Sequence, residues 1–176
     1  TFFLNHLPEI GDAVTRGTAW LTLWDDMLEG GTSPADLFAL ALRALPQETE
    51  EQNVERILAY TSDTYWRFLS DAERAGASSR LEQALLAGIR DAPRTSLKSA
   101  YDYIGMAQEL ALRTVGGTEA ILREQLNRIT DPDRKARFAF VAPALSSDAT
   151  TRDAFFAGLA RVESREHEPW VVDALR

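Results

Sequence analysis

Apolar side chains recur along the chain at intervals of three and four residues, the spacing of a helix that buries one face. The clearest stripe begins at Trp20 and continues through Leu23, Trp24, Met27 and Leu28. The sustained alternation of apolar and polar residues that marks a half-buried strand is missing. The pattern predicts helices over residues 13–29, 34–45, 50–69, 71–91, 96–114, 118–129, 132–145 and 148–162, and another from about residue 168.

Residues typical of helix starts and ends lie at the edges of these stripes. Ser33 and Pro34 suit an N-cap and the first helical position. Capping boxes, in which a hydroxyl and a carboxylate or amide satisfy each other's backbone N–H groups, are predicted for TEEQ (49–52) and SDAE (70–73). Further starts are predicted at TSLK (95–98) and DPDR (131–134), and C-terminal glycines at EGG (29–31) and VGG (115–117).

Short connections between the predicted helices make neighbours antiparallel. The helices pair as hairpins over residues 13–45, 50–91, 96–129 and 132–162, and the hairpins start about 36 to 46 residues apart. That period is typical of helical arrays of the HEAT or armadillo kind. We therefore expect an all-α fold in which antiparallel helix hairpins stack as a superhelical array, forming a single domain over residues 1–176. A compact bundle with irregular packing is the alternative.

The net charge of −8 is unevenly distributed along the chain. Residues 1–89 carry −8, residues 90–137 carry +2, and residues 138–176 carry −2. The acidic N-terminal half argues against a nucleic-acid-binding protein, which usually presents a broad basic face. No run of about 18 apolar residues is present, so the sequence predicts no membrane-spanning helix. No cysteines are present, which excludes disulfides and thiol catalysis.

A search for catalytic patterns yields only fragments. HEPWV (167–171) begins like the zinc-binding His-Glu-x-x-His, but its fifth residue is Val and its proline would break the required helical turn. The pairs Asp25/Asp26 and Glu50/Glu51 are adjacent on helices and point about 100° apart, which makes them poor acid–base partners. We therefore predict no catalytic residue and no metal ligand in the chain, and we interpret Ser33, Ser70 and Ser96 as helix caps.

The densest basic cluster lies in DPDRKARFAFVAPAL (131–145), where Arg134, Lys135 and Arg137 follow a predicted helix start. Cations in the first turns of a helix interact unfavourably with the helix dipole, and each such interaction costs about 0.3 kcal/mol or more. The cluster therefore calls for a local partner or a ligand. Ion pairs with Asp131, Asp133 or a neighbouring helix are the structural interpretation.

Four segments, taken in order, resemble the C-terminal helical domain of bacterial zinc aminopeptidases of the aminopeptidase N family. The segments are TRGTAWLTLWDDML (15–28), LALRALPQETEEQNVERIL (40–58), PDRKARFAFVAPALSSDATTRDAFF (132–156) and REHEPWVVDAL (165–175). They are patterns of packing and loops rather than of catalysis, and the likeness runs from about residue 13 to the end.

The resemblance implies a HEAT-like domain that closes the catalytic chamber and positions peptides for removal of their N-terminal residue. It implies a larger parent polypeptide with its zinc in the absent catalytic domain, so no cofactor is expected in this chain. The expected partners are that catalytic domain and the peptide substrate, with neither nucleic acid nor membrane. Arg134, Lys135 and Arg137 are then candidates to meet a peptide carboxylate. The expected setting is soluble, in the bacterial cytoplasm or periplasm.

Both ends of the sequence, TFFLNHL (1–7) and WVVDALR (170–176), are rich in apolar residues, whereas the ends of natural domains are usually polar. We expect a piece of a longer polypeptide, with trimming or disorder as the other explanation. The competing hypothesis for function is a free-standing helical-repeat module that binds a peptide or protein in a concave groove.

Overall fold

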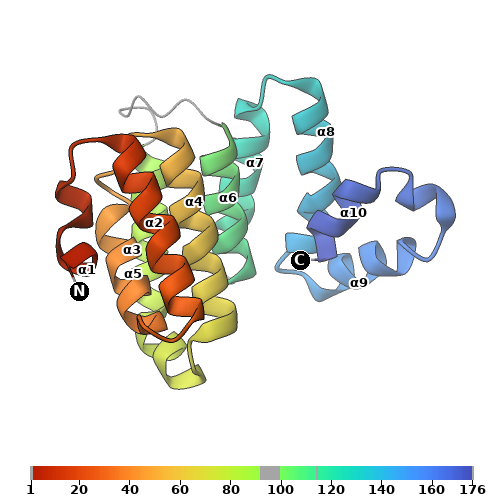
Figure 1. Ribbon diagram of the computed structural model, residues 1–176. Coiled ribbons are helices and arrows are strands. Elements are labelled where there is room, and N and C mark those ends of the chain that lie inside the picture. The colour runs from red at the N-terminus through yellow and green to blue at the C-terminus, as the bar shows by residue number, and fades with distance from the viewer. Residues whose placement is uncertain (1, 92–99, 114, 176) are drawn as a thin grey trace. The chain divides into compact units, whose positions relative to one another are not determined.

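The computed structural model describes the backbone of residues 2–91, 100–113 and 115–175, and the side chains of all of these except residues 90, 91 and 100–104. Every regular element within these ranges is a helix, which confirms the predicted all-α class (Figure 1). In the part of the chain that the structure describes, no helix combines the length and apolarity needed to cross a membrane.

The chain divides into two compact units, residues 1–106 and residues 107–176, called here the N-terminal unit and the C-terminal unit. The helix α6 contributes to both. The single helical-repeat domain expected over 1–176 stays a prediction. In the N-terminal unit the elements are α1 (Phe2–His6), the 3-10 helix η1 (Leu7–Glu9), α2 (Ala13–Leu28), α3 (Pro34–Ala44), α4 (Glu51–Asp63), the π-helix η2 (Thr64–Phe68), α5 (Asp71–Asp91) and the start of α6 (Ala100–Leu112).

The C-terminal unit is built from shorter helices. After α6 come α7 (Thr118–Arg128), α8 (Pro132–Val141), the 3-10 helix η4 (Ala142–Leu145), α9 (Ala149–Gly158), the 3-10 helix η5 (Val162–Arg165) and α10 (Glu168–Leu175). The predicted helix over 132–145 is therefore α-helical only as far as Val141. Pro143 explains the change, because it has no N–H to donate and its ring disfavours the regular α-helical ladder.

Several predicted caps are present as hydrogen bonds. The Ser33 hydroxyl accepts from the Asp36 amide at 3.1 Å and opens α3. At the start of α5, Glu73 Oε2 accepts from the Ser70 amide at 2.8 Å and the Ser70 hydroxyl accepts from the Glu73 amide at 3.4 Å, the reciprocal bonds of a capping box. Gly30 has a φ of 84°, a left-handed conformation that glycine adopts without strain, and it follows the end of α2.

Other local predictions were wrong or lie outside the described residues. The capping box predicted for TEEQ does not form, because the amides of Thr49 and Glu50 donate to the buried carboxylate of Glu48 instead. Gly117 has the left-handed φ of 83°, but it occupies the N-cap of α7 rather than the end of the preceding helix. The TSLK start, with Ser96, lies outside the described residues. The helix α1 was not predicted.

One buried apolar cluster of the N-terminal unit lies among α2, α3 and α4 and includes Leu7 of η1. Leu81 and Leu85 of α5 are buried as well. Figure 1 shows α2 beside α4, with α3 and α5 behind them. The predicted α2 stripe is only partly correct, since Leu28 is 54% exposed and Trp24 is half-buried. The cluster among α2, α3 and α4 comprises Leu7, Ala19, Trp20, Leu23, Met27, Leu37, Leu40, Ala41, Ala44, Leu45, Val54 and Ile57.

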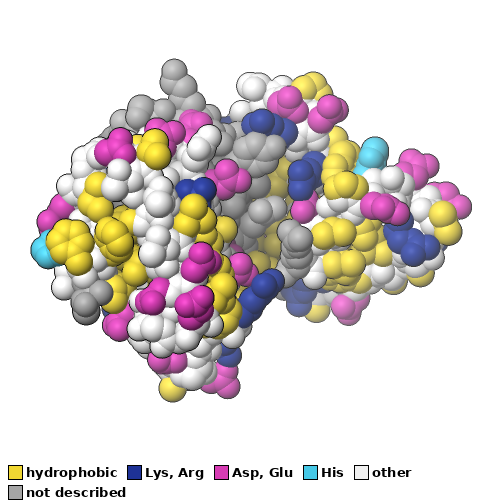
Figure 2. Space-filling view, viewed as in Figure 1, with side chains coloured by type: hydrophobic (Ala, Val, Ile, Leu, Met, Phe, Trp, Pro, Cys, Tyr) yellow, Lys and Arg dark blue, Asp and Glu magenta, His cyan; other side chains and the backbone are white. Residues whose placement is uncertain are grey.

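The C-terminal unit has a smaller buried core, which includes Leu122, Ile129, Phe138 and Val141. Beyond it, aromatic rings connect α8 to the later helices: the Phe140 ring lies 5.5 Å from that of Phe155 and 5.7 Å from that of Trp170. No residue of α9 or α10 is buried, and Figure 2 shows hydrophobic side chains gathered on the surface of these helices.

Candidate functional site

The three predicted cations lie on α8, and all three are exposed. Asp131 caps this helix as predicted, because its carboxylate accepts from the Arg134 amide at 2.8 Å and its carbonyl oxygen accepts from the Lys135 amide at 3.0 Å. The structure therefore brings the backbones of Arg134 and Lys135 to a capped helix start.

Arg137 has a partner on another helix. Its Nε donates to Asp173 Oδ2 of α10 at 2.5 Å, and the two side chains are 44% and 27% exposed. This contact is an ion pair to a neighbouring helix, which is one of the structural interpretations of the basic cluster. Ion pairs with this exposure contribute about 0.2–1 kcal/mol, so Arg137 positions α10 weakly while part of its guanidinium stays open to solvent. A contact between these cations and a peptide carboxylate stays a prediction.

A small pocket of about 280 Å³ lies beside α8 in the C-terminal unit, and none of the three cations lines it. Its walls are Glu119, Leu122, Arg123, Leu126, Phe138, Ala142, Pro143, Ser146 and Thr151.

At the rim of this pocket, Glu119 accepts from the Ser147 hydroxyl at 2.9 Å and from the Ser146 hydroxyl at 3.2 Å. The bonds from the Ser147 hydroxyl and amide, followed by that from Ser146, lower the pKa of Glu119. These contacts tie the start of α7 to the η4–α9 connection, and they stabilise the ionised carboxylate rather than a proton on it.

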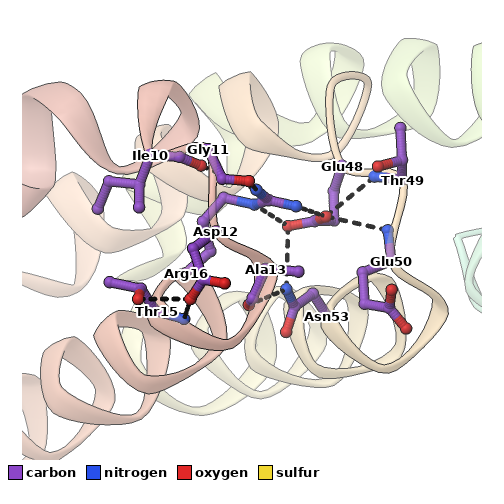
Figure 3. A network of polar contacts seen from close by, with 10 residues as sticks. All are labelled: Ile10, Gly11, Asp12, Ala13, Thr15, Arg16, Glu48, Thr49, Glu50 and Asn53. Atoms are coloured by element: carbon purple, nitrogen blue, oxygen red, sulfur yellow. Dashed lines mark hydrogen bonds and ion pairs between the residues drawn. The ribbon is translucent and has the colours of Figure 1, made fainter.

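A buried polar network of the N-terminal unit centres on Glu48, in the α3–α4 connection (Figure 3). Arg16 of α2 meets this carboxylate with two nitrogens: Nη2 lies 2.6 Å from Oε1 and Nε lies 2.9 Å from Oε2. The Arg16 and Glu48 side chains are 12% and 3% exposed. No local pattern predicts this pair, because the two residues are 32 positions apart in the sequence.

Both members of the pair make further hydrogen bonds to neighbouring groups. Arg16 Nη1 donates to the carbonyl oxygens of Ile10 at 2.8 Å and Gly11 at 3.0 Å. On the other side, Asn53 Nδ2 donates to Glu48 Oε2 at 3.2 Å and to the Ala13 carbonyl oxygen at 3.0 Å. Figure 3 shows how the network joins the segment before α2 to the loop before α4.

Two opposing effects set the pKa of Glu48. Burial raises it, while the Arg16 hydrogen bond and the Glu50 and Thr49 amides lower it more, so the pKa lies below its ordinary value. An ionised carboxylate that is saturated with donors is a poor general base, because proton uptake would cost it these bonds. The network is therefore a structural connection between helices.

The WDD segment (24–26) also has a structural explanation. Asp26 Oδ2 accepts from the Thr32 hydroxyl at 2.5 Å, and its carbonyl oxygen accepts from the Gly31 amide at 2.8 Å, so Asp26 holds the α2–α3 turn. The Trp24 ring stacks on that of Tyr60 with a centroid distance of 4.3 Å. Burial raises the pKa of the Tyr60 hydroxyl.

The remaining candidates have local contacts. His167 of the HEPWV segment stacks on Trp170 with a ring distance of 4.0 Å. Glu50 is exposed at the N-cap position of α4 and makes no side-chain capping bond. Among the described residues, no three His, Cys, Asp or Glu side chains gather closely enough to hold a metal ion.

Comparisons with protein families, with curated proteins and with solved structures find no match to this chain.

Proposed function

We propose that this chain is the accessory C-terminal helical domain of a zinc-dependent aminopeptidase, and that it closes the catalytic chamber and positions peptides for removal of their N-terminal residue. The observation that carries the proposal is the ordered set of four segments, spread over most of the chain, that resemble this domain of the aminopeptidase N family.

Side-chain contacts in the N-terminal unit support the proposal, because they join the first of the four segments to the second. Arg16 belongs to TRGTAWLTLWDDML (15–28), whereas Glu48 and Asn53 belong to LALRALPQETEEQNVERIL (40–58). A motif of packing rather than catalysis is expected to specify such a contact, since losing one partner of a buried ion pair is strongly destabilising.

The last two segments are connected in the same way in the C-terminal unit. Arg137 and Phe140 belong to the third segment, and their partners Asp173 and Trp170 belong to the fourth. The four segments thus form two pairs, each joined by specific side-chain contacts. We propose that the helices stack as a HEAT-like array, in which each hairpin buries the apolar face of the next.

In the proposed enzyme, zinc would activate the water that attacks the first peptide bond. The residues of this chain do not fit a zinc site, because the sequence contains no His-Glu-x-x-His motif, so the metal would be held by another part of the polypeptide. This chain would exclude long or folded substrates and hold the distal part of a peptide. The exposed cations Arg134 and Lys135 are suited to that second task, since their charges lie at the surface.

Kinetics of the complete polypeptide test the proposal. Lys135→Ala and Arg134→Ala should raise KM for acidic peptides several-fold. Both kcat and KM for a single-residue aminoacyl arylamide should stay unchanged, because that substrate is too short to reach this domain. Arg161→Ala removes an exposed cation of the same unit and is the matched control. A polypeptide without metal-dependent aminopeptidase activity would contradict the proposal. Unchanged KM values for every peptide would show that Arg134 and Lys135 do not contact the substrate.

A free-standing module that binds a peptide is the other function compatible with an all-helical chain. The two proposals differ in what they require of the gene. An accessory domain needs an upstream catalytic sequence in the same reading frame, whereas a free-standing module needs none.

A further inference from the structure

A groove lies between α3 and α5 in the N-terminal unit, and none of the three predicted cations lines it. It has a volume of about 480 Å³, within the range of about 300–1,000 Å³ typical of ligand pockets. Each helix contributes three residues with the spacing i, i+3, i+4, so each presents one continuous face to the groove. The lining residues are Ala39, Leu42 and Arg43 of α3 and Arg80, Gln83 and Ala84 of α5.

The composition of the lining explains why there is space between the two helices. Ala39 and Ala84 have short side chains, and they leave open a volume that larger residues would fill. Leu42 is half-buried and adds apolar surface. The groove therefore has an apolar part flanked by two guanidinium groups and the amide of Gln83.

The charge of this groove is opposite to that of the segment around it. Residues 1–89 carry 14 carboxylates and only six cations, all of them arginines. Three of the six arginines form ion pairs: Arg16, Arg67 and Arg74. Arg43 and Arg80 have no carboxylate within ion-pair distance among the described residues, and no carboxylate lines the groove.

Arg43 is held in place by one contact that leaves most of its donors available. Its Nη2 donates to the carbonyl oxygen of Leu4 at 2.6 Å. A guanidinium has five N–H donors in a planar arrangement that matches a carboxylate, so one bond to a carbonyl oxygen fixes the group and keeps it competent to bind an anion.

We propose that this groove binds an acidic peptide segment in which an apolar side chain lies between two carboxylates. The carboxylates pair with Arg43 and Arg80, the apolar side chain packs on Ala39, Leu42 and Ala84, and the Gln83 amide bonds to the peptide backbone. The inference rests on the groove alone and stands whether or not the chain belongs to a peptidase.

An anionic membrane surface fits the same arginines less well. A membrane is a broad negative surface, and it would approach the many carboxylates of residues 1–89 together with the two arginines. A short peptide makes contact only within the groove, and charges beyond about 8 Å are screened at physiological salt. The chemistry thus favours a peptide occupant.

Fluorescence anisotropy of the complete chain with a labelled peptide containing Glu-Ala-Leu-Glu tests the proposal. The unmodified chain should bind this peptide saturably below about 1 mM, less tightly as salt rises from about 50 to 300 mM, and should not bind the Gln-Ala-Leu-Gln version. Arg80→Gln should weaken binding about tenfold through loss of a charge-assisted contact. Ala84→Glu should abolish binding, since it fills the groove and pairs with Arg80 one turn away.

Arg67→Gln is the matched control, because it removes an exposed arginine of the same unit from outside the groove, and it should change the affinity less than about twofold. Circular dichroism and melting temperature verify that each variant folds. Equal affinity of the unmodified chain and Arg80→Gln would overturn the inference. So would equal affinity for the two peptides, or binding to phosphatidylserine vesicles with no binding to the acidic peptide.

Discussion

Replacing Glu48 by Gln isolates the electrostatic part of the buried network of the N-terminal unit. The glutamine keeps the size of the side chain and one carbonyl oxygen, which can still accept from the Thr49 and Glu50 amides. Its NH₂ group takes the place of the other carboxylate oxygen and faces N–H donors of Arg16 and Asn53. A donor then opposes donors in a site where the side chain is only 3% exposed.

The size of the effect follows from the geometry of the pair. At nitrogen–oxygen distances of 2.6 and 2.9 Å, the attraction between the two charges is about 6 kcal/mol for an effective dielectric constant of about 20, before desolvation is subtracted. Breaking a buried pair by removing one partner costs about 3–5 kcal/mol. Arg16 keeps its bonds to Ile10 and Gly11. We therefore expect Glu48→Gln to lower the free energy of unfolding of this unit by about 2–4 kcal/mol.

Urea unfolding followed by tryptophan fluorescence measures this loss. Three of the four tryptophans, Trp20, Trp24 and Trp66, lie in the N-terminal unit, and the fourth is Trp170. A Trp170→Phe background makes the emission report on the N-terminal unit alone. Trp20 is fully buried, so unfolding should shift its emission strongly.

Two further variants separate the ion pair from other effects. Glu50→Gln makes the same chemical change at an exposed position two residues away, and it should alter the free energy of unfolding by less than about 0.5 kcal/mol. A double-mutant cycle of Glu48→Gln with Arg16→Met should give a coupling energy of at least about 1.5 kcal/mol. A loss for Glu48→Gln no larger than that for Glu50→Gln would refute the reasoning.

The same network predicts a pH dependence. The pKa of Glu48 is lower in the folded protein than its ordinary value of 4.5, so the unfolded chain binds a proton more readily. The stabilisation is fully present above that ordinary value and is lost as the pH falls through the lowered pKa. The difference in unfolding free energy between the unmodified chain and Glu48→Gln should therefore shrink as the pH falls below about 4.5, and a difference that grows would contradict the sign.

Three other changes give smaller but definite results. In Gly17→Ala the new methyl group would meet the Asn53 amide oxygen at 2.7 Å and should lower the free energy of unfolding by about 1–3 kcal/mol. In Gly76→Ala, on α5, the methyl group meets nothing within 4 Å and should raise the free energy of unfolding by about 0.5–1 kcal/mol. Thermal unfolding measures both. Arg137→Ala breaks only the exposed pair with Asp173, so a double-mutant cycle with Asp173→Asn should give about 0.2–1 kcal/mol, and a coupling above about 2 kcal/mol would show a stronger contact than the exposure allows.

Helix positions were predictable because their signals are local. Ser33, Ser70 and Asp131 act within three residues of the amide or carboxylate that they contact, so the sequence contains both partners of each cap within one turn. The apolar period gave the buried faces for the same reason. It could not tell that Pro143 would change the last turn after α8 to a 3-10 helix.

The side-chain networks were not predictable, because their partners are distant in sequence. In the sequence, Glu48 is one of several carboxylates in an acidic segment, and nothing nearby distinguishes it. Its role depends on Arg16 of α2, which only the fold brings into contact with it. Arg43 and Arg80 likewise face one groove only because α3 packs near α5. For Arg137 the sequence offered local and interhelical partners alike, and only the fold selects Asp173.

The coding sequence upstream of Thr1 tests the proposed function most directly. If the chain is the accessory domain of a zinc aminopeptidase, the same open reading frame should encode His-Glu-x-x-His followed by a further glutamate ligand before it reaches this chain. A start codon directly before Thr1, or an upstream frame without these zinc ligands, would contradict the proposal.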